Sequence, residues 1–352
     1  MEFLYSFIHK EMIERKIREI INNKNFIYLD DFIRICHQDS KNGYYRTREV
    51  IGKDGDFITS PEISQLFGEV VSFCLINQII QKNIRNFNLI ELGPGKGTLL
   101  KDIDRTFKKI NNEFDYSIHI NEINKNYLEH IKEIFPNCKN HIKFNDYPKT
   151  YSTIVANEFF DALPVRQIIM KDHEMKEVGV TIDDNGNFSF DHYEARCDTK
   201  NFMSQQKSLQ NGQIFEISPD ANYILDELCS FLKYSKGHLL IFDYGFLNTS
   251  FSSTLQSLYK NQKTNLLDNI GKQDITYHIN FSEFKNIIEK FEPETINFYN
   301  QSEFLEKNGI HERAYDLIQN NSDAKDEIEQ QVKRLWGKEE MGELFKVLEV
   351  VF

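Results

Sequence analysis

The chain has 352 residues, 40% of them hydrophobic, and a net charge of −12, so it can bury a large core as two domains or as one domain with insertions. The acidic balance argues against a general affinity for nucleic acid, because phosphate binding needs clustered positive charge. The sequence contains no uncharged apolar run of about 18 residues. We therefore expect neither a nucleic acid partner nor a membrane span.

The five cysteines lie far apart and form no C-x-x-C pair, so the sequence predicts no metal site and no disulfide framework. Residues 1–24 mix acidic with basic side chains and lack the apolar run of a signal peptide. The acidic residues also disfavour a transit peptide. From these features we expect a cytoplasmic protein with reduced thiols.

Apolar side chains at helical spacing predict a helix over 3–21 that docks on the rest of the chain. A second helix is expected to begin at Asp30 or Asp31, whose carboxylates can cap it, and to end before residue 42. These two helices make up a helical N-terminal segment.

Residues 43–62 follow neither a helical nor a strand period and combine Gly, Asp, Ser and Thr with aromatic residues. A long irregular segment of this kind favours a lid or substrate loop. The alternative is a structural Ω-loop in which Tyr44, Tyr45 and Phe57 are buried. Helical spacing resumes over 63–81.

An apolar run at 89–92 leads into a glycine-rich turn and then into helix-forming residues at 98–109, which predicts a strand, a tight turn and a helix. The glycines occupy alternate positions: Gly93, Gly95 and Gly97. A dinucleotide fingerprint counted from Gly93 would need a third glycine where Thr98 stands, and a P-loop fails at the same place. The acid Glu91 suits a cationic ligand, and the pattern looks like the first motif of S-adenosylmethionine-dependent methyltransferases. The alternative is a glycine turn that binds nothing.

Alternating apolar positions predict a second strand over 116–122 that ends in Glu122. In Rossmann-like folds an acid at the end of the second strand, about 20 residues past the turn, holds the ribose hydroxyls. Glu122 is therefore the ribose candidate, and the alternative is an ordinary solvent-exposed strand-end carboxylate. A helix over 125–135 and a strand over 141–144 should follow, with Asp146 just beyond it as a candidate for contact with adenine.

The fourth predicted strand, 151–156, runs directly into a cluster of an amide and two acids: Asn157, Glu158 and Asp161. In open α/β sheets ligands bind beyond the carboxyl ends of the strands, so this cluster should lie beside the cofactor. Its position matches the segment with which many amino-group methyltransferases hold a target nitrogen. The alternative is a helix cap at Asn157 with the phenylalanines at 159 and 160 in the core.

The rest of the chain continues to alternate between strands and helices. We expect an inserted antiparallel meander at 165–192, strands at 213–219, 237–245, 295–299 and 344–352, helices at 220–234, 283–291 and 324–336, and a loop-like region at 251–275. Asp243 ends the strand over 237–245. About seven core strands in this alternation are the pattern of a class I methyltransferase, a Rossmann-like α/β fold.

Several motifs together resemble the MidA-like family of class I S-adenosylmethionine-dependent methyltransferases, and the resemblance covers nearly the whole chain. They are Gly43-Tyr-Tyr, Gly55-Asp-Phe-Ile-Thr-Ser-Pro-Glu-Ile-Ser, Phe67-Gly-Glu, Glu91-Leu-Gly-Pro-Gly-Lys-Gly-Thr, Asn157-Glu-Phe-Phe-Asp-Ala-Leu-Pro-Val-Arg-Gln, Glu216-Ile-Ser-Pro, Asp243-Tyr-Gly, Asp274-Ile-Thr and Glu340-Met-Gly-Glu-Leu-Phe-Lys-Val-Leu. The resemblance implies S-adenosyl-L-methionine as the cofactor. It also implies N-methylation of a protein arginine in the assembly of respiratory complex I (NADH dehydrogenase), because the family includes a mitochondrial complex I assembly methyltransferase.

Two departures from the family pattern limit what carries over. The family's Tyr-x-x-His is Tyr259-Lys-Asn-Gln262 here, and its Asp-Ile-Thr-Ala-His-Val-Asp is Asp274-Ile-Thr-Tyr-His-Ile-Asn280. Both lie on the expected substrate side, so cofactor binding carries over better than substrate identity. The alternative function is a non-catalytic assembly or scaffold protein that binds S-adenosylmethionine. A third reading, an NAD-dependent oxidoreductase, is opposed by Thr98.

For an arginine acceptor, acidic groups must orient the charged guanidinium and accept its proton. We expect Glu158 and Asp161 to clamp it, with Asp243 and Glu62 as further candidates. The expected cofactor residues are Glu91, Gly93, Gly95, Gly97, Thr98, Glu122, Asp146 and Asn157. The expected parts are N-terminal helices with the loop (1–87), a cofactor domain (88–163 with 212–352) and the inserted meander (164–211). The meander is a candidate substrate platform, a candidate homodimer surface, or both.

Overall fold

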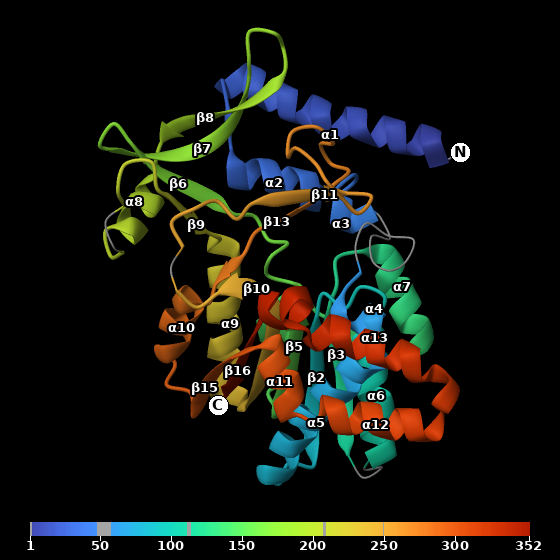
Figure 1. Cartoon of the computed structure of the whole chain (residues 1–352). Helices are drawn as coiled ribbons and strands as arrows, with labels where there is room; N and C mark the ends of the chain where they lie inside the picture. Colours follow the sequence, from blue (N-terminus) through green and yellow to red (C-terminus); the bar gives the residue numbers. More distant parts are fainter. Residues whose placement is uncertain (1, 48–57, 111–113, 207–208, 249) are drawn as a thin grey trace. The chain divides into compact units, whose positions relative to one another are not determined.

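The computed structural model describes residues 2–47, 58–110, 114–206, 209–248 and 250–352 (Figure 1). The chain divides into two compact units. Unit 1 comprises Met1–Arg48, Asp161–Tyr223 and Phe246–Ser282, and unit 2 comprises Glu49–Phe160, Ile224–Gly245 and Glu283–Phe352. This division differs from the expected parts, because residues 1–48 and 246–282 belong to the same unit as the meander.

Unit 2 is built around a mixed sheet with the strand order β15-β16-β10-β5-β2-β3-β4. The strands are β2 (Asn86–Leu92), β3 (Asp115–Asn121), β4 (Lys139–Asn140), β5 (Ser152–Asn157), β10 (Gly237–Phe246), β15 (Thr295–Asn300) and β16 (Phe345–Val351). Neighbouring strands from β4 to β10 run parallel, whereas β16 is antiparallel to both β10 and β15. This sheet confirms the predicted Rossmann-like class I methyltransferase fold.

Helices cover the sheet of unit 2, as Figure 1 shows. They are α4 (Ser60–Ile63), α5 (Gln65–Gln81), α6 (Thr98–Ile110), α7 (Lys125–Ile134), α11 (Gln301–Lys307), α12 (Ile310–Asn320) and α13 (Lys325–Trp336), with η1 (Phe144–Asp146), η2 (Ser322–Ala324) and η3 (Lys338–Gly342) as short turns. Two further helices, α9 (Pro219–Ser235) and α10 (Phe281–Glu289), begin in unit 1 and continue into unit 2. Every residue of β5 is buried, because both faces of a central parallel strand are covered.

The order of the strands creates the binding edge of the sheet. The first strand of the parallel set, β2, lies between β3 and β5, so the chain leaves it toward one side and later returns on the other. At such a switch point the loops beyond the carboxyl ends of the strands diverge and leave room for a ligand. The glycine turn follows β2, and the segment from residue 157 onward follows β5.

In unit 2 one sequence prediction was wrong and two helices were missed. The strand expected at 141–144 is the shorter β4, which ends at Asn140, and Phe144 begins the turn η1 instead. The helices α11 and α12 were not predicted. More than half of the residues in each are polar or charged, so the apolar pattern alone did not separate these helices from a loop.

Unit 1 contains an antiparallel sheet in which β1 (Ile27–Tyr28), β7 (Glu174–Ile182), β6 (Arg166–Lys171) and β9 (Ile214–Ile217) are joined in this order, and β8 (Phe188–Glu194) pairs with β7. The predicted meander is therefore confirmed, with the N-terminal strand β1 added to it. The helices are α1 (Glu2–Lys24), α2 (Leu29–Gln38), α3 (Tyr44–Thr47) and α8 (Cys197–Met203).

The region 251–275 is not a loop. It contributes β11 (Gln256–Tyr259), β12 (Gln262–Lys263) and β13 (Asp274–Thr276), which form a three-stranded antiparallel sheet, and β14 (Ile279–Asn280) follows. The strands are short and mostly polar, which hid them from a hydrophobic pattern. The expected lid at 43–62 begins with α3 and ends with α4; its middle, including Phe57, lies outside the described residues.

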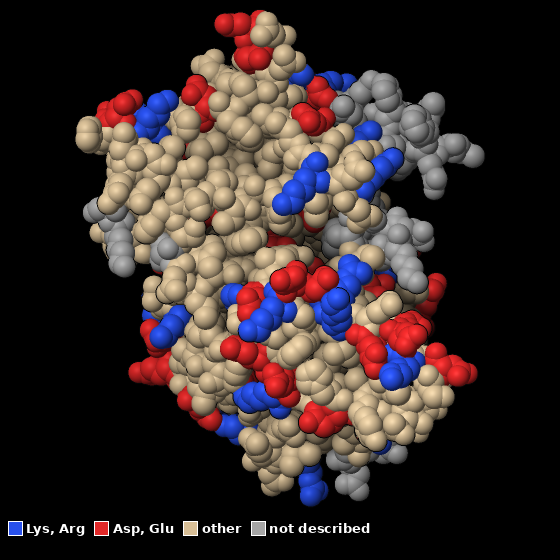
Figure 2. Space-filling view, in the orientation of Figure 1, with Lys and Arg blue, Asp and Glu red and all other residues tan. Residues whose placement is uncertain are grey.

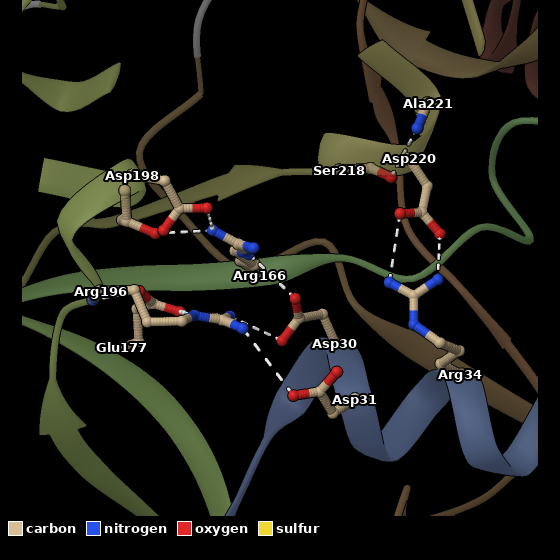
Figure 3. A network of polar contacts seen from close by, with 11 residues as sticks. Asp30, Asp31, Arg34, Arg166, Glu177, Arg196, Asp198, Ser218, Asp220 and Ala221 are labelled. Atoms are coloured by element: carbon tan, nitrogen blue, oxygen red, sulfur yellow. Dashed lines mark hydrogen bonds and ion pairs between the residues drawn. The ribbon is translucent and has the colours of Figure 1, made fainter. Parts of the chain in front are cut away.

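Arginine–carboxylate pairs join α2 to the antiparallel sheet of unit 1 (Figure 3). The buried carboxylate of Asp30 accepts from Arg166 Nε at 2.9 Å and from Arg196 Nη2 at 2.7 Å. Arg196 also donates to Glu177 at 2.6 Å. The prediction that Asp30 or Asp31 caps α2 was therefore wrong: Tyr28 is the N-cap residue and its side chain makes no capping hydrogen bond.

The charged side chains on the visible face of the molecule are mixed in sign. Figure 2 shows Lys and Arg next to Asp and Glu on this face, without a broad area of positive charge alone. Ion pairs such as Lys325–Glu329 at 3.8 Å and Lys338–Glu343 at 3.7 Å contribute to this mixing in unit 2. Among the described helices, none combines the length and the apolar character that crossing a bilayer requires.

Candidate functional site

The glycine turn joins the carboxyl end of β2 to α6 and has a backbone that other residues would strain. Gly93, Gly95 and Gly97 have φ angles of 61°, 53° and 73°, in the left-handed region that glycine tolerates. A Cβ added at Gly93 would lie 2.9 Å from Cδ2 of Phe159, and one at Gly97 would lie 3.2 Å from Cγ1 of Ile131. The three glycines therefore allow both the tight turn and the close approach of neighbouring segments.

Glu91 lies in β2, two residues before Gly93, and is 4% exposed. Its Oε2 has no hydrogen-bond partner among the described residues, although the backbone N–H of Leu100 donates to the carboxyl group. Burial raises the pKa of Glu91 to about 8. An acid in this state is ready to ionise when a cation or a hydrogen-bond donor reaches it.

Glu122 follows β3 and contacts the glycine turn itself. Its Oε2 accepts from the backbone N–H of Gly95 at 3.2 Å, and its Oε1 accepts from that of Asn124 at 2.7 Å. Asn140 of the next strand bonds both the backbone N–H and the carbonyl of Glu122, at 2.9 Å each. Burial raises the pKa of Glu122 to about 7, although the amides that donate to it act in the opposite direction.

The segment after β5 is held beside the turn by its backbone. Glu158 has a φ of 51°, which is unfavourable for a residue with a side chain. Its N–H donates to the carbonyl of Phe242 in β10 at 2.9 Å. Its Oε1 accepts from the N–H of Ser60 at 3.2 Å and from Nδ2 of Asn157 at 3.2 Å.

Asn157 and Asp243 are buried at the same edge and differ in how their polar atoms are used. Oδ1 of Asn157, a side chain only 8% exposed, has no hydrogen-bond partner in the described part of the chain. Asp243 is completely buried; its Oδ2 accepts from the N–H of Phe160 at 2.9 Å and its Oδ1 from that of Tyr244 at 2.9 Å. Asp243 therefore shapes the turn that follows β5.

The remaining predicted site residues are less closely associated. Glu62, in α4, accepts a hydrogen bond from the hydroxyl of Thr98, the first residue of α6. Asp146 is exposed in the turn η1. Asp161 is buried and is the first residue of the second segment of unit 1. The structure thus brings the predicted cofactor and catalytic residues of unit 2 to one edge of the sheet, while the role of each stays a prediction.

Sequence reasoning missed three contributors to this edge. Ser60 acts through its backbone N–H, Phe159 through its ring against Gly93, and Asn140 through its amide on Glu122. Only Ser60 had a signal, since Thr59-Ser-Pro-Glu62 has the helix-start pattern with proline in the first turn. The other two depend on contacts between distant segments.

A second buried cluster of titratable groups lies elsewhere in unit 2. Cys74, His238 and Glu349 have ligand atoms within 4.8 Å of one another, as a shared metal ion would require. Here Oε1 of Glu349 contacts His238 Nε2 at 3.1 Å and accepts from Cys74 Sγ at 3.4 Å. Its Oε2 accepts from Asn297 Nδ2 and from the hydroxyl of Tyr299, both at 3.2 Å. The carboxylate is thus already bound by protein groups, and the absence of a metal site stays a prediction.

Comparisons with known proteins show what the chain is similar to. Residues 72–298 match the model of a family described as "Putative S-adenosyl-L-methionine-dependent methyltransferase". The mitochondrial protein arginine methyltransferase NDUFAF7 of Bos taurus is 31% identical over 340 residues, covering 88% of this chain and 76% of that protein. The Rattus norvegicus protein of the same name is 29% identical over 369 residues, covering 96% and 84%.

Solved structures show the same fold. A Burkholderia thailandensis protein bound to S-adenosyl-homocysteine has a TM-score of 0.85 and 22% identity, covering 99% of this chain and 93% of that one. The comparison with the relatives also corrects one prediction. The relatives are named as mitochondrial, which contradicts the predicted cytoplasmic location. That prediction relied on the absence of a recognisable targeting pattern, and such an absence does not identify a compartment.

Proposed function

The chain belongs to the S-adenosyl-L-methionine-dependent methyltransferase family, and from this membership we propose that it N-methylates an arginine of a protein substrate during assembly of respiratory complex I. The arginine acceptor is supported by the names of the relatives. The observation that carries the chemistry is a pair of buried polar atoms, Glu91 Oε2 and Asn157 Oδ1, which lack a hydrogen-bond partner among the described residues and lie at the carboxyl edge beside the glycine turn.

The residues at this edge fit the cofactor. S-adenosyl-L-methionine carries an ammonium and a sulfonium, so the carboxyl groups of Glu91 and Glu122 suit its charge, and Glu122 can accept from ribose hydroxyls. The glycine turn lacks the Cβ atoms that would press against Phe159 and Ile131, so its backbone stays accessible at a tight bend. Thr98 begins the helix behind the turn, and Asp146 is assigned to the adenine end. These residues, together with Asn157, form the proposed cofactor site.

When bound, the cofactor supplies a methyl group on a positively charged sulfur. The protein has to hold the acceptor nitrogen in line with that group, exclude water and accept the proton that the nitrogen loses. An arginine guanidinium is charged and a poor nucleophile, so carboxylates must orient it. We assign this task to Glu158 and Asp161, with Asn157 orienting the nitrogen through Oδ1 and Asp243 supporting the turn.

The test is methyl transfer from labelled S-adenosyl-L-methionine to proteins in an extract of cells that lack this chain. We expect one main labelled protein, and methylated arginine in its acid hydrolysate. Glu158→Gln, which keeps the shape of the side chain, should lose labelling while S-adenosyl-homocysteine binds with unchanged Kd. Full activity of Glu158→Gln would overturn the role of Glu158, and labelling of another residue type would overturn the arginine acceptor.

The alternative is a non-catalytic assembly or scaffold protein that binds the cofactor. The contacts of Glu158 favour it, because this carboxylate already accepts from Ser60 and Asn157 within the chain. The same assay separates the two functions: a scaffold would bind S-adenosyl-homocysteine and label no protein. Restoration of complex I assembly by a variant that binds cofactor but transfers no methyl group would also support the scaffold.

We further propose that the chain forms a homodimer through the sheet of unit 1. Strand β8 pairs only with β7 among the described strands, so its outer edge can accept another strand, and Phe190 on β8 is 44% exposed. Light scattering of the purified protein should give twice the mass of the chain, and Phe190→Glu should reduce it to that of one chain. A single-chain mass for both would contradict the dimer.

A further inference from the structure

The short helix α4 contacts both halves of the proposed catalytic edge. At its start, the backbone N–H of Ser60 donates to Oε1 of Glu158 at 3.2 Å. Two residues later, Glu62 accepts from the hydroxyl of Thr98 at the beginning of α6. The four-residue helix α4 therefore contacts the segment after β5 and the residue that directly follows the glycine turn. That segment and the turn also contact each other, through Phe159 and Gly93.

The neighbouring helices hold α4 in place. The hydroxyl of Ser60 donates to Oε1 of Gln301 at 3.4 Å, and Nε2 of Gln301 donates to the carbonyl of Leu335 at 2.8 Å. Ser64, directly after α4, caps α5 and donates to Oε1 of Gln331 at 2.6 Å. These bonds connect α4 to α11 and α13. They hold Ser60 and Glu62 in place at the site.

Glu158 needs such support, because it adopts a left-handed backbone conformation. Its φ of 51° is unfavourable for a residue with a side chain. Strained conformations of this kind persist only where the surroundings hold them. Ser60 and Asn157 supply that constraint by binding the carboxylate.

We propose that α4 is a positioning element: Glu62 holds the glycine turn through Thr98, while Ser60 holds Glu158. In this arrangement Glu62 is a positioning residue that accepts a hydrogen bond, and not an acid that contacts the substrate. This assignment rests on the proposed function. The sequence had grouped Glu158 and Glu62 as catalytic candidates; here Glu158 faces the acceptor and Glu62 shapes the cofactor loop.

The experiment compares variants that keep and remove the Glu62–Thr98 hydrogen bond. Glu62→Gln keeps an acceptor and loses the charge, and Thr98→Ser keeps the hydroxyl; Glu62→Ala and Thr98→Val remove one partner each. We expect Glu62→Ala and Thr98→Val each to raise the Kd of S-adenosyl-homocysteine about fivefold to tenfold, the usual effect of losing one hydrogen bond. The double variant Glu62→Ala/Thr98→Val should lose no more than either alone.

The kinetic readout distinguishes positioning from proton transfer. The removing variants should raise the KM for S-adenosyl-L-methionine by the same factor and leave kcat within about twofold. Glu62→Gln and Thr98→Ser, which keep the hydrogen bond, should raise this KM less than the removing variants do. Thr106→Val is the matched control, because it removes a hydroxyl that donates within α6 to Asp102, at 2.7 Å, and should leave Kd unchanged.

Two results would overturn the proposal. If Glu62→Gln abolishes turnover while cofactor affinity is kept, Glu62 is catalytic. If Glu62→Ala leaves the Kd unchanged, the contact does not position the turn. The binding measurements need no turnover, so they test α4 even if the chain transfers no methyl group, and failure of the proposed function is recognised separately.

Discussion

Two buried carboxyl groups in the sheet of unit 2 have opposite properties. Glu91, at the carboxyl end of β2, has an oxygen without a partner among the described residues, and burial raises its pKa to about 8. Glu349 of β16 pairs in register with Leu240 of β10, which pairs with Val155 of β5, the partner of Glu91, so the two acids lie in the same row of the sheet on different strands. Burial alone would raise the pKa of Glu349 too, but the hydrogen bond and charge of His238, the charge of Lys307 and the bond from Cys74 bring it down to about 2.

The two acids differ in what stabilises their charge. The partners of Glu349 are all protein groups, so its charge is stabilised when the chain folds. Among the described groups, only the backbone N–H of Leu100 lowers the pKa of Glu91, so a bound cation or hydrogen-bond donor would stabilise its charge further. The strained backbone of Glu158 lies at the same edge as Glu91, as is common at sites that a ligand completes.

The largest effect is expected for Gly93→Ala. The new Cβ would have to accept a φ of 61° and lie 2.9 Å from Phe159, so we expect the Kd of S-adenosyl-homocysteine to rise about a hundredfold or more. Gly186→Ala is the control, because its φ of 81° carries similar strain with nothing within 4 Å of the added atom. It should lower stability and leave the Kd unchanged. If Gly93→Ala bound S-adenosyl-homocysteine with the wild-type Kd, the glycine turn would not be part of the cofactor site.

A smaller effect, on stability alone, is expected for Glu349→Gln. Loss of the charge should lower the free energy of unfolding at pH 7 by about 2 kcal/mol, because His238 and Lys307 lose an ionised partner. Since the folded pKa lies below the usual 4.5, the contribution of Glu349 is present above pH 4.5 and is lost as the pH falls toward 2. Urea unfolding of both proteins at pH 7 and pH 3 should show the difference shrinking, with cofactor affinity at pH 7 unchanged. An altered affinity would contradict the purely structural role.

Replacing Glu158 separates backbone strain from side-chain function. Both Glu158→Ala and Glu158→Gly lose the carboxylate, but only glycine relieves the left-handed conformation, so the Gly variant should be more stable by about 1 kcal/mol. Both should lose methyl transfer. The exposed Glu292, with a φ of 55°, offers a matched pair of substitutions that should give the same stability difference with full activity. Equal stability of the two Glu158 variants would show that the site stores no strain.

The smallest change at pH 5 is expected for Glu91→Gln, and it should grow with pH. The folded pKa of Glu91 lies above its usual 4.5, so the folded protein keeps a proton that the unfolded chain releases, and wild-type stability falls as the pH rises toward 8. Glu91→Gln does not lose stability in this way. The slopes of unfolding free energy against pH should therefore differ between the two proteins by at most about 1.4 kcal/mol per pH unit. Unfolding free energies between pH 5 and 9 measure it. Parallel pH profiles would mean that Glu91 already has a partner for its charge.

Much of unit 2 could be predicted because its signals are local. The apolar run of β2, the glycines at alternate positions and the helical spacing of α6 lie within 25 residues, and the predicted strand and helix both appear. The short strands β11 to β13 gave no such signal, because they are two to four residues long, mostly polar, and recognisable only from their pairing with one another. The segment after β5 was located from its place at the end of a strand, but the strain at Glu158 was not visible in the sequence.

The sequence by itself determined the fold class and located the glycine turn and the acids at the strand ends, because hydrophobic period and glycine conformation depend on neighbouring residues. Only the tertiary structure decided what each acid does. Asp30 binds Arg166 and Arg196 instead of capping its helix, Glu62 binds Thr98, and the pKa values of Glu91 and Glu349 move in opposite directions. A carboxylate takes its role from burial and from partners distant in the chain, and both exist only after folding.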